Sequence, residues 1–177
     1  MNYSMKKSGK ARFILIVAAL AVIVGCAGFL IGNAGISAAA ERATVRAWVI
    51  CQPGDYVNLR SKASRSSMQV GRLDCGDEIE LDGETRNGFA RVVNLTIDTP
   101  AEVWIHTGYL VFDKPEWYGD SMAVVGNARV AARKCCDGEV RRWMKPGTEV
   151  YTYYRSDEWC VTNRGFIKSE YLEVGSE

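Results

Sequence analysis

The stretch Trp-Ile-His-Thr-Gly-Tyr-Leu at residues 104–110 has a counterpart in Phe-Ile-Lys-Ser-Glu-Tyr-Leu at residues 166–172. Each follows a matching opening, Val-Asn-Leu-Arg at 57–60 in the first case and Val-Ala-Ala-Arg at 130–133 in the second. Self-similarity at such a distance indicates that one small structural unit is used twice. The sequence therefore predicts two modules, and the closer spacing within the second copy indicates shorter loops, which a fold tolerates at little cost.

The part of the chain after Ala47 consists of short runs rich in β-branched and aromatic residues, separated by turn residues and without helical periodicity. It predicts an all-β fold with two small barrels in tandem, at residues 45–111 and 128–174. The segment 112–127 between them is too aromatic for a free linker, so we expect it to pack on a barrel. The strands predicted for the first module are Val45–Ile50, Tyr56–Arg60, Gly71–Leu73, Glu78–Leu81, Phe89–Val93 and Val103–His106. Those predicted for the second are Ala128–Ala132, Glu139–Trp143, Glu149–Tyr154, Trp159–Thr162 and Gly165–Ile167.

The amino-terminal segment, residues 1–40, has the composition of a membrane anchor or an export signal. Four basic residues precede an uncharged run of Ile, Leu, Val and Ala at residues 13–32, which is long enough to cross a bilayer as a helix. Cations on the leading side place that side in the cytoplasm and the two modules outside the cell. The length of the run favours an uncleaved single-pass anchor. Two other fates stay open: cleavage after the small residues 37–40, and lipidation at Cys26, whose surroundings resemble a lipobox.

The charge of the exported part argues against nucleic-acid binding. Four of the 22 basic residues precede the apolar run, which leaves 18 against 21 acidic residues in the remainder of the chain. Neither module has the concentrated basic face that phosphate recognition requires. We expect a partner to be bound by shape, aromatic stacking and hydrogen bonds.

The cysteines of the exported part predict disulfide bonds, since small modules outside the cytoplasm often depend on them. Cys51 with Cys75 would close one loop in the first module, and Cys135 or Cys136 with Cys160 would close one in the second. The alternative is that all five are reduced and buried. Adjacent cysteines, no Cys-x-x-Cys pair and a single histidine argue against a metal site.

Several motifs of the first copy resemble the bacterial SH3-like domain: the opening at 57–61, Val-Gly-Arg-Leu at 70–73, Gly-Asp-Glu-Ile at 76–79 and the ending at 104–110. The family ending is usually Gly-Trp-Val-x-Ser-x-Tyr-Leu, which the second copy matches more closely at 165–172. The first copy has Val103 in place of the glycine. The resemblance implies small β-barrels in the cell envelope, often attached to peptidoglycan hydrolases as wall-targeting modules.

We do not expect the chain to be an enzyme, and its sequence indicates no cofactor. A hydrolase of the kind often fused to such domains needs a Cys nucleophile with a His base, or a metal held by His and Asp. The single histidine, His106, occupies a position that the family fills with Ser or His before the terminal Tyr-Leu, so we interpret it as structural.

Aromatic side chains are the best candidates for ligand contacts, because peptidoglycan offers sugar faces that stack on rings and short peptides that lie in grooves. Tyr56, Trp104 and Tyr109 could line a cleft in the first module, and Tyr153, Tyr154 and Trp159 are expected to be exposed in the second. Tyr151 and Tyr153 are expected on one face of a strand and Tyr154 on the other. Trp104 and Tyr109 could instead be core residues, since they occupy repeat-matched positions.

Two functional hypotheses follow. The first is a non-catalytic, membrane-tethered envelope protein that binds peptidoglycan or its peptides. The alternative is an adaptor whose barrels bind an extended peptide of another envelope protein. A purely structural stalk is a weaker third possibility.

Overall fold

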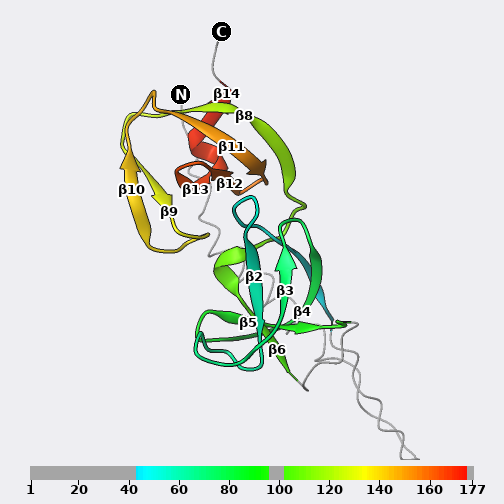
Figure 1. The fold of residues 1–177 in the computed structure, drawn as a ribbon. Helices are drawn as coiled ribbons and strands as arrows, with labels where there is room; N and C mark the ends of the chain where they lie inside the picture. Colours follow the sequence, from blue (N-terminus) through cyan, green and yellow to red (C-terminus); the bar gives the residue numbers. More distant parts are fainter. Residues whose placement is uncertain (1–42, 96–101, 175–177) are drawn as a thin grey trace, which may run out of the picture. The chain divides into compact units, whose positions relative to one another are not determined.

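The computed structural model describes residues 43–95 and 102–174, and these form two seven-stranded antiparallel sheets (Figure 1). The prediction of an all-β fold is confirmed. Within the described residues, no helix has the length and apolar character needed to cross a membrane. The predicted anchor at residues 1–40, with its apolar run at 13–32 and Cys26, lies outside the described residues.

The first sheet has the strand order β3-β2-β6-β5-β4-β1-β7. Its fourth and fifth strands form a long hairpin that turns at Asn87 and Gly88, both of which have positive φ. A single turn of 3-10 helix, η1, separates β6 from β7. The elements are β1 (Val45–Val49), β2 (Tyr56–Arg60), β3 (Gln69–Asp74), β4 (Glu78–Arg86), β5 (Phe89–Val93), β6 (Val103–His106), η1 (Thr107–Tyr109) and β7 (Leu110–Val111).

The second sheet has the order β10-β9-β13-β12-β11-β8-β14, which is the order of the first sheet with every number raised by seven. A second 3-10 turn, η2, again separates the last two strands. The repeat read from the sequence therefore extends to the whole topology. The elements are β8 (Glu116–Val124), β9 (Val130–Arg133), β10 (Val140–Met144), β11 (Glu149–Arg155), β12 (Trp159–Thr162), β13 (Gly165–Lys168), η2 (Ser169–Tyr171) and β14 (Leu172–Val174).

The segment assigned to a packed linker at 112–127 contains β8, the second sheet's counterpart of β1. Strand β8 pairs with β11 on one side and with β14 on the other, so it is an inner strand of the second sheet. The second sheet therefore begins at Glu116. Strand β8 is difficult to predict from the sequence, because its exposed aromatic residues resemble those of a linker that packs on a surface.

The predicted barrels are not closed. In the first sheet, β6 pairs with β2 and β5, while β7 pairs with β1 at the far edge. Because β6 and β7 are separated only by η1, they lie close together although they pair with different strands of the sheet. The sheet therefore curls, so that its edge at β1 approaches β6. No pairing joins β3 to β7 among the described residues. The result is a curled open sheet, and the second sheet repeats this arrangement.

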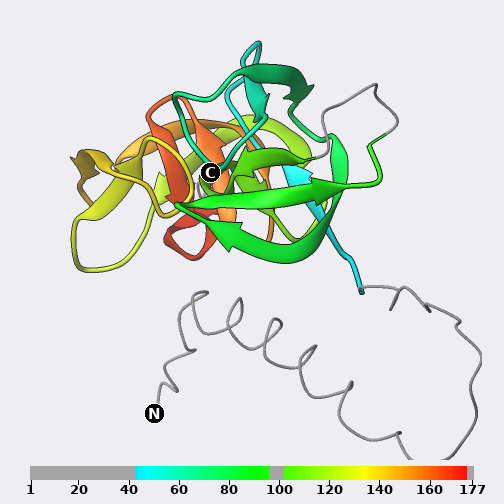
Figure 2. The same cartoon turned by 90° about the horizontal axis from the view of Figure 1, so that it is seen from below.

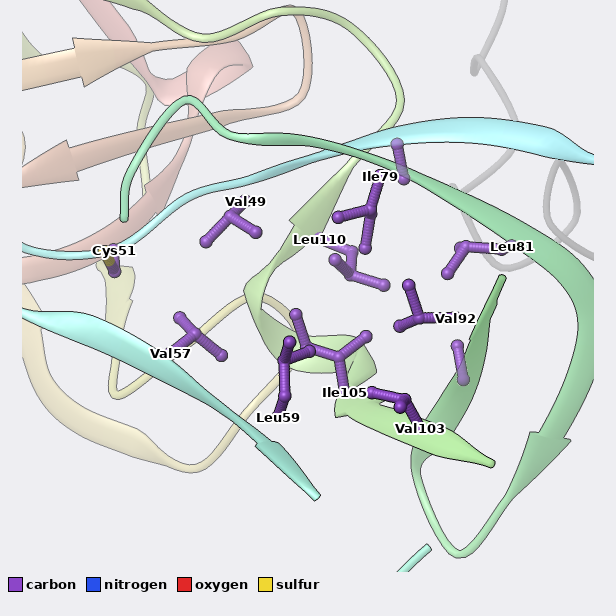
Figure 3. Close-up of a cluster of buried hydrophobic side chains, with 12 residues drawn as sticks. Val49, Cys51, Val57, Leu59, Ile79, Leu81, Val92, Val103, Ile105 and Leu110 are labelled. Atoms are coloured by element: carbon purple, nitrogen blue, oxygen red, sulfur yellow. The ribbon is translucent and has the colours of Figure 1, made fainter. Parts of the chain in front are cut away.

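Each sheet has its own core, and a third cluster lies where the two sheets meet. Figure 3 shows the first core, in which Val57 and Leu59 of β2 face Ile79, Leu81 and Ile105. The alternation of buried and exposed residues along β2 and β4 is that of strands with one face on a core. The second core is centred on the buried strands of the second sheet. The third contains Ile50 and Val111 of the first sheet with Cys136, Trp159, Val161 and Phe166 of the second.

Both sheets belong to one compact unit, and Figure 2 shows their strands next to each other from a second direction. Hydrogen bonds reinforce the apolar contact. The Gln52 side chain donates to the Thr162 carbonyl at 3.2 Å, and the Asp157 backbone N–H donates to the Asp113 carboxylate at 2.6 Å. The interface between the two sheets is therefore held by specific hydrogen bonds as well as by apolar packing.

Candidate ligand-binding sites

A groove of about 670 Å³ lies between the first sheet and the turn that joins β9 to β10. This volume is in the range of pockets that bind small molecules. One wall is formed by β2 and η1, and the other by residues 134–139. The lining residues are Tyr56, Val57, Asn58, Arg60, Arg65, Phe89, His106, Thr107, Gly108, Tyr109, Lys134, Cys135, Cys136, Asp137, Gly138 and Glu139. Two residues predicted to bind a ligand, Tyr56 and Tyr109, are among them.

The loop after β2 is held over this groove by its own hydrogen bonds. The Arg60 guanidinium donates to the Ser67 carbonyl at 2.8 Å, and the Ser67 hydroxyl donates to the carbonyls of Lys62 and Ser64. These bonds fix the loop that presents Arg65. In the second sheet, Arg133 donates in the same way to the Gly138 carbonyl at 2.7 Å. The arginine shared by both copies is thus a loop anchor.

His106 lies at the junction of β6 and η1, and both of its ring nitrogens face donors. Its Nδ1 accepts from the Gly108 backbone N–H at 3.1 Å, which caps η1. Its Nε2 lies 3.1 Å from Nη2 of Arg65. Burial lowers the pKa of His106, and the positive charge of Arg65 lowers it further. His106 is therefore neutral near pH 7 and structural at Nδ1, while Nε2 faces the groove.

The second wall of the groove is in direct contact with the first sheet. The Cys136 backbone N–H donates to the Gly108 carbonyl at 2.8 Å, and Cys136 itself is buried in the cluster between the sheets. A Cβ at Gly108 would lie 2.7 Å from Sγ of Cys135 and 3.1 Å from the Cys136 carbonyl oxygen, so a side chain there would force the second wall to shift. The groove is consequently assembled from both copies of the repeat.

A second candidate site is an aromatic patch on the second sheet, made of Trp117, Tyr151, Tyr153 and Tyr154. Trp117 of β8 is 59% exposed, and its ring centroid lies 6.2 Å from that of Tyr153 and 5.2 Å from that of Tyr154. The rings of Tyr151 and Tyr153 are 5.2 Å apart. The Tyr151 hydroxyl donates to the Gly119 carbonyl at 2.8 Å, which ties the patch to β8.

Tyr154 does not lie apart from Tyr153 as expected from simple alternation. The pairing register of β11 shifts between Thr152 and Tyr154 against both neighbouring strands. Such an irregularity changes the direction of the side chains that follow it. The rings of Tyr153 and Tyr154 therefore both contact Trp117. Simple alternation along β11 predicts that only one of these two tyrosines would do so.

Two residues predicted as ligand contacts are buried. Trp104 is 1% exposed, beneath the guanidinium of Arg86. Trp159 is 2% exposed, so its expected exposure is wrong. Its ring fills the cluster between the sheets together with Ile50 and Val111, a contact that neither copy makes alone. Neither indole can stack on a ligand from these positions.

The five described cysteines are free thiols, so the predicted disulfides are not formed in the structure. The Sγ atom of Cys160 lies 3.3 Å from the Ser169 hydroxyl in the core of the second sheet. Cys135 and Cys136 lie on the turn that faces the first sheet, which separates their environment from that of Cys160. The expected pairing within the second module is therefore absent.

Cys51 and Cys75 are neighbours at one end of the first core. The Cys51 backbone N–H donates to Sγ of Cys75 at 3.5 Å. A hydrogen bond between the two thiols raises the pKa of Cys51 far above its usual range and lowers the pKa of Cys75. The thiolate of this pair therefore forms on Cys75, which is also the more exposed of the two.

We predict that mild oxidation of the folded chain with diamide joins Cys51 to Cys75 and leaves the other thiols reduced, so that they are alkylated once the chain is unfolded. The Cys75 thiolate is the attacking group, and diamide takes up the two electrons. Closing this loop would raise the free energy of unfolding by roughly 3 kcal/mol. Peptide mass spectrometry after thiol blocking identifies the bond, and Cys75→Ser is the control. A bond between any other pair would contradict the prediction.

Among residues 43–95 and 102–174, no group of three or more His, Cys, Asp or Glu side chains is arranged to hold a metal ion.

Burial raises the pKa of Cys135, the thiol that lies next to Gly108 and near His106. A nucleophilic cysteine needs the opposite shift.

Comparison with known proteins assigns a class to the first sheet. Residues 55–111 match the family described as "Bacterial SH3 domain". This region runs from the start of β2 through β7, so the first sheet contains a bacterial SH3-like domain. No curated protein matches the chain.

Two solved structures are similar to the chain at low identity. NlpC1 from Trichomonas vaginalis is 16% identical, with a TM-score of 0.33, over 77% of this chain and 48% of that one. NlpC2 from the same organism is 15% identical, with a TM-score of 0.32, over 76% and 49%. The chain thus spans about half the length of these structures.

Three features of the two sites have little signal in the sequence. Arg65 lies in a serine-rich loop that resembles any solvated loop. Trp117 lies in the segment assigned to a linker, and the turn at 134–139 belongs to the other copy of the repeat. A comparison of the two copies that included residues 116–124 could have identified β8 and, with it, Trp117.

Proposed function

We propose that the chain is a non-catalytic cell-envelope protein that binds peptidoglycan or its peptides through two SH3-like domains. The aromatic patch around Trp117 is the observation that carries this proposal. The run at residues 13–32 would tether the protein to the membrane, with the two domains outside. Sequence family, topology and surface chemistry each support one part of the proposal.

The tandem arrangement is supported by topology. The match to the bacterial SH3 domain covers β2 to β7 of the first sheet, and the second sheet repeats the strand order of the first and its 3-10 turn before the last strand. We infer that the second sheet, Glu116–Val174, is a diverged copy of the same domain.

The chemistry of the patch suits a glycan. Sugar rings present apolar C–H faces that pack on exposed aromatic rings, and tyrosine hydroxyls add hydrogen bonds at the edge. Trp117 offers the most exposed ring of the group. Rings already in mutual contact lose little freedom when a ligand binds, which favours affinity.

The absence of catalysis is a proposal that rests on the state of the two candidate groups. A cysteine protease or amidase requires a thiolate and a histidine that is free to accept its proton. Cys135 has a raised pKa, and Nδ1 of His106 already accepts from Gly108. This environment favours binding over nucleophilic attack.

The test is co-sedimentation of the purified full-length chain, in detergent, with intact peptidoglycan sacculi. We expect the parent to sediment with a Kd in the micromolar range. Trp117→Ala with Tyr154→Ala should weaken binding about tenfold, which corresponds to about 1.4 kcal/mol. Trp143→Ala is the matched control, because Trp143 is also 59% exposed but lies on β10.

Equal losses in the Trp117 and Trp143 variants would show that the patch is not the binding surface. A parent that stays in solution at high sacculus concentration would reject peptidoglycan as the ligand. Circular dichroism of each variant would establish that it is folded.

The adaptor alternative is favoured by the edge strand β10. Among the strands that the structure describes, β10 pairs with β9 alone, and Arg141, Arg142 and Trp143 on β10 are exposed. An exposed edge can accept an extended peptide as an additional strand. Replacing Arg142 with proline removes a backbone N–H from β10 and should abolish capture of such a peptide while sacculus binding is unchanged.

A further inference from the structure

We propose that the groove between the two sheets binds the carboxylate of a short peptide between Arg65 and His106. This inference rests on the proposed function, since it names the chemical group that a peptidoglycan peptide would present. It concerns a site separate from the aromatic patch, and its residues come from the loop after β2 and from the end of β6.

Both ring nitrogens of His106 lie within hydrogen-bonding distance of donors. A neutral imidazole has one lone pair and one N–H. The Gly108 amide donates to Nδ1, which places the ring proton on Nε2. That Nε2–H faces Nη2 of Arg65 at 3.1 Å, and the guanidinium can only donate. Two donors at this distance cannot bond to each other, so the pair is complete only with an acceptor that both can reach.

The required acceptor is negatively charged. Burial lowers the pKa of His106, and the full positive charge that Arg65 carries lowers it further. Burial raises the pKa values of Tyr109 and Cys135, and the positive charge of Arg65 opposes that rise in both. A planar carboxylate can accept from a guanidinium with one oxygen and from an imidazole N–H with the other.

Arg65 is held in place before any ligand arrives. Its loop is tied to β2 through Arg60 and Ser67, and the Asn87 side chain donates to the Ala63 carbonyl at 3.3 Å. Edge contacts fix the imidazole from two sides, with the Phe89 ring at 5.2 Å and the Tyr109 ring at 5.8 Å. A site that is ordered in advance loses little entropy on binding.

The remainder of the groove suits a peptide. Its volume of about 670 Å³ can hold a few residues. Asn58 lines it, and Oδ1 of Asn58 is a buried acceptor without a donor among the described residues. A peptide N–H supplies such a donor. On the opposite wall, Glu139 is paired with Lys134 at 2.7 Å, which reduces repulsion of a carboxylate.

The experiment compares two probes by titration calorimetry with the full-length chain in detergent. The first probe is N-acetylmuramyl-L-alanyl-D-isoglutamine, which has one free carboxylate, and the second is the same compound with that carboxylate amidated. We expect amidation to weaken binding at least about tenfold, as for the loss of a charge-assisted hydrogen bond. Inorganic phosphate is the third probe and should bind more weakly than the acid.

Three variants assign the effect to the two donors. Arg65→Gln should weaken binding of the acid about tenfold and leave binding of the amide unchanged. His106→Asn keeps an acceptor for the Gly108 N–H but removes the Nε2 donor. It should therefore weaken binding of the acid by a smaller factor than Arg65→Gln does. Lys62→Gln removes one positive charge from the same exposed loop and is the control, with no change expected.

The inference is overturned if the acid and the amide bind equally, if the acid does not bind at millimolar concentration, if phosphate binds as tightly, or if Lys62→Gln and Arg65→Gln have equal effects. A thermal melt of each variant separates misfolding from loss of contact. Failure of the proposed function is recognised separately: the chain would then stay in solution with sacculi while preferring the acid over the amide. Sedimentation without that preference would reject the carboxylate site alone.

Discussion

Replacing Gly165 with alanine is expected to lower the free energy of unfolding by about 3 kcal/mol or more. Gly165 begins β13 with a φ of +126°, a region that residues with a side chain rarely adopt. A Cβ there would also lie 2.5 Å from the Arg133 carbonyl oxygen on the neighbouring strand. Because the backbone fixes the position of the Cβ and its partner is a backbone oxygen, no side-chain rotation relieves the clash. Urea unfolding followed by circular dichroism measures the effect.

Gly147→Ala is the matched control for this substitution. Gly147 also has a positive φ, of +76°, but a Cβ there would meet nothing within 4 Å. The control therefore includes the conformational cost, about 1 kcal/mol, without the clash. If the two variants lost the same stability, the close approach of β13 to β9 would be wrong.

The second large effect is expected for Arg91→Met, which should cost about 3 kcal/mol. The Arg91 guanidinium donates through Nε to Asp82 at 2.7 Å and also pairs with Glu84 at 3.0 Å. The side chain of Asp82 is only 4% exposed. Removing the guanidinium leaves a buried carboxylate without its main counter-charge, and the hairpin of β4 and β5 loses the bridge between its strands.

Two comparisons make the Arg91 prediction specific. Arg46→Met breaks the exposed pair with Glu78, whose groups are 3.4 Å apart, and should cost less than about 1 kcal/mol. Adding Asp82→Asn to Arg91→Met should recover part of the loss, since the buried charge is gone. Thermal or urea unfolding provides all the values. A double variant less stable than Arg91→Met would indicate that Asp82 is stabilised mainly by other groups.

Much of the fold could be predicted because the signals are local. The bounds of β2, β5, β6 and β12 agree with the predicted strands Tyr56–Arg60, Phe89–Val93, Val103–His106 and Trp159–Thr162. Each is a short apolar run bounded by turn residues, so alternation and length determine it. By contrast, β4 extends to Arg86, five residues beyond its predicted end. Its last residues are polar and are held by pairing with β5.

The parts that could not be predicted depend on contacts between the two copies. Trp159 is an aromatic residue in a strand, and the sequence cannot show that its outer face is covered by Ile50 and Val111. The groove likewise needs a turn from residues 134–139 against Gly108. A pattern within one copy carries no information about which surface of the other copy it meets. The sequence did identify Tyr56 and Tyr109, which lie on the local wall of the groove.

The construction of the groove links ligand binding to the association of the two sheets. Because one wall comes from each sheet, a ligand that contacts both stabilises their docked arrangement by RT ln(1 + [L]/Kd). A change that leaves only a fraction of the molecules docked lowers the apparent affinity in proportion to that fraction. The hollow beside Trp143 and Tyr171 in the second sheet has about 290 Å³ and is lined by that sheet alone. The two sheets thus present two surfaces of unequal kind, and only one of these surfaces is sensitive to a pulling force between the sheets.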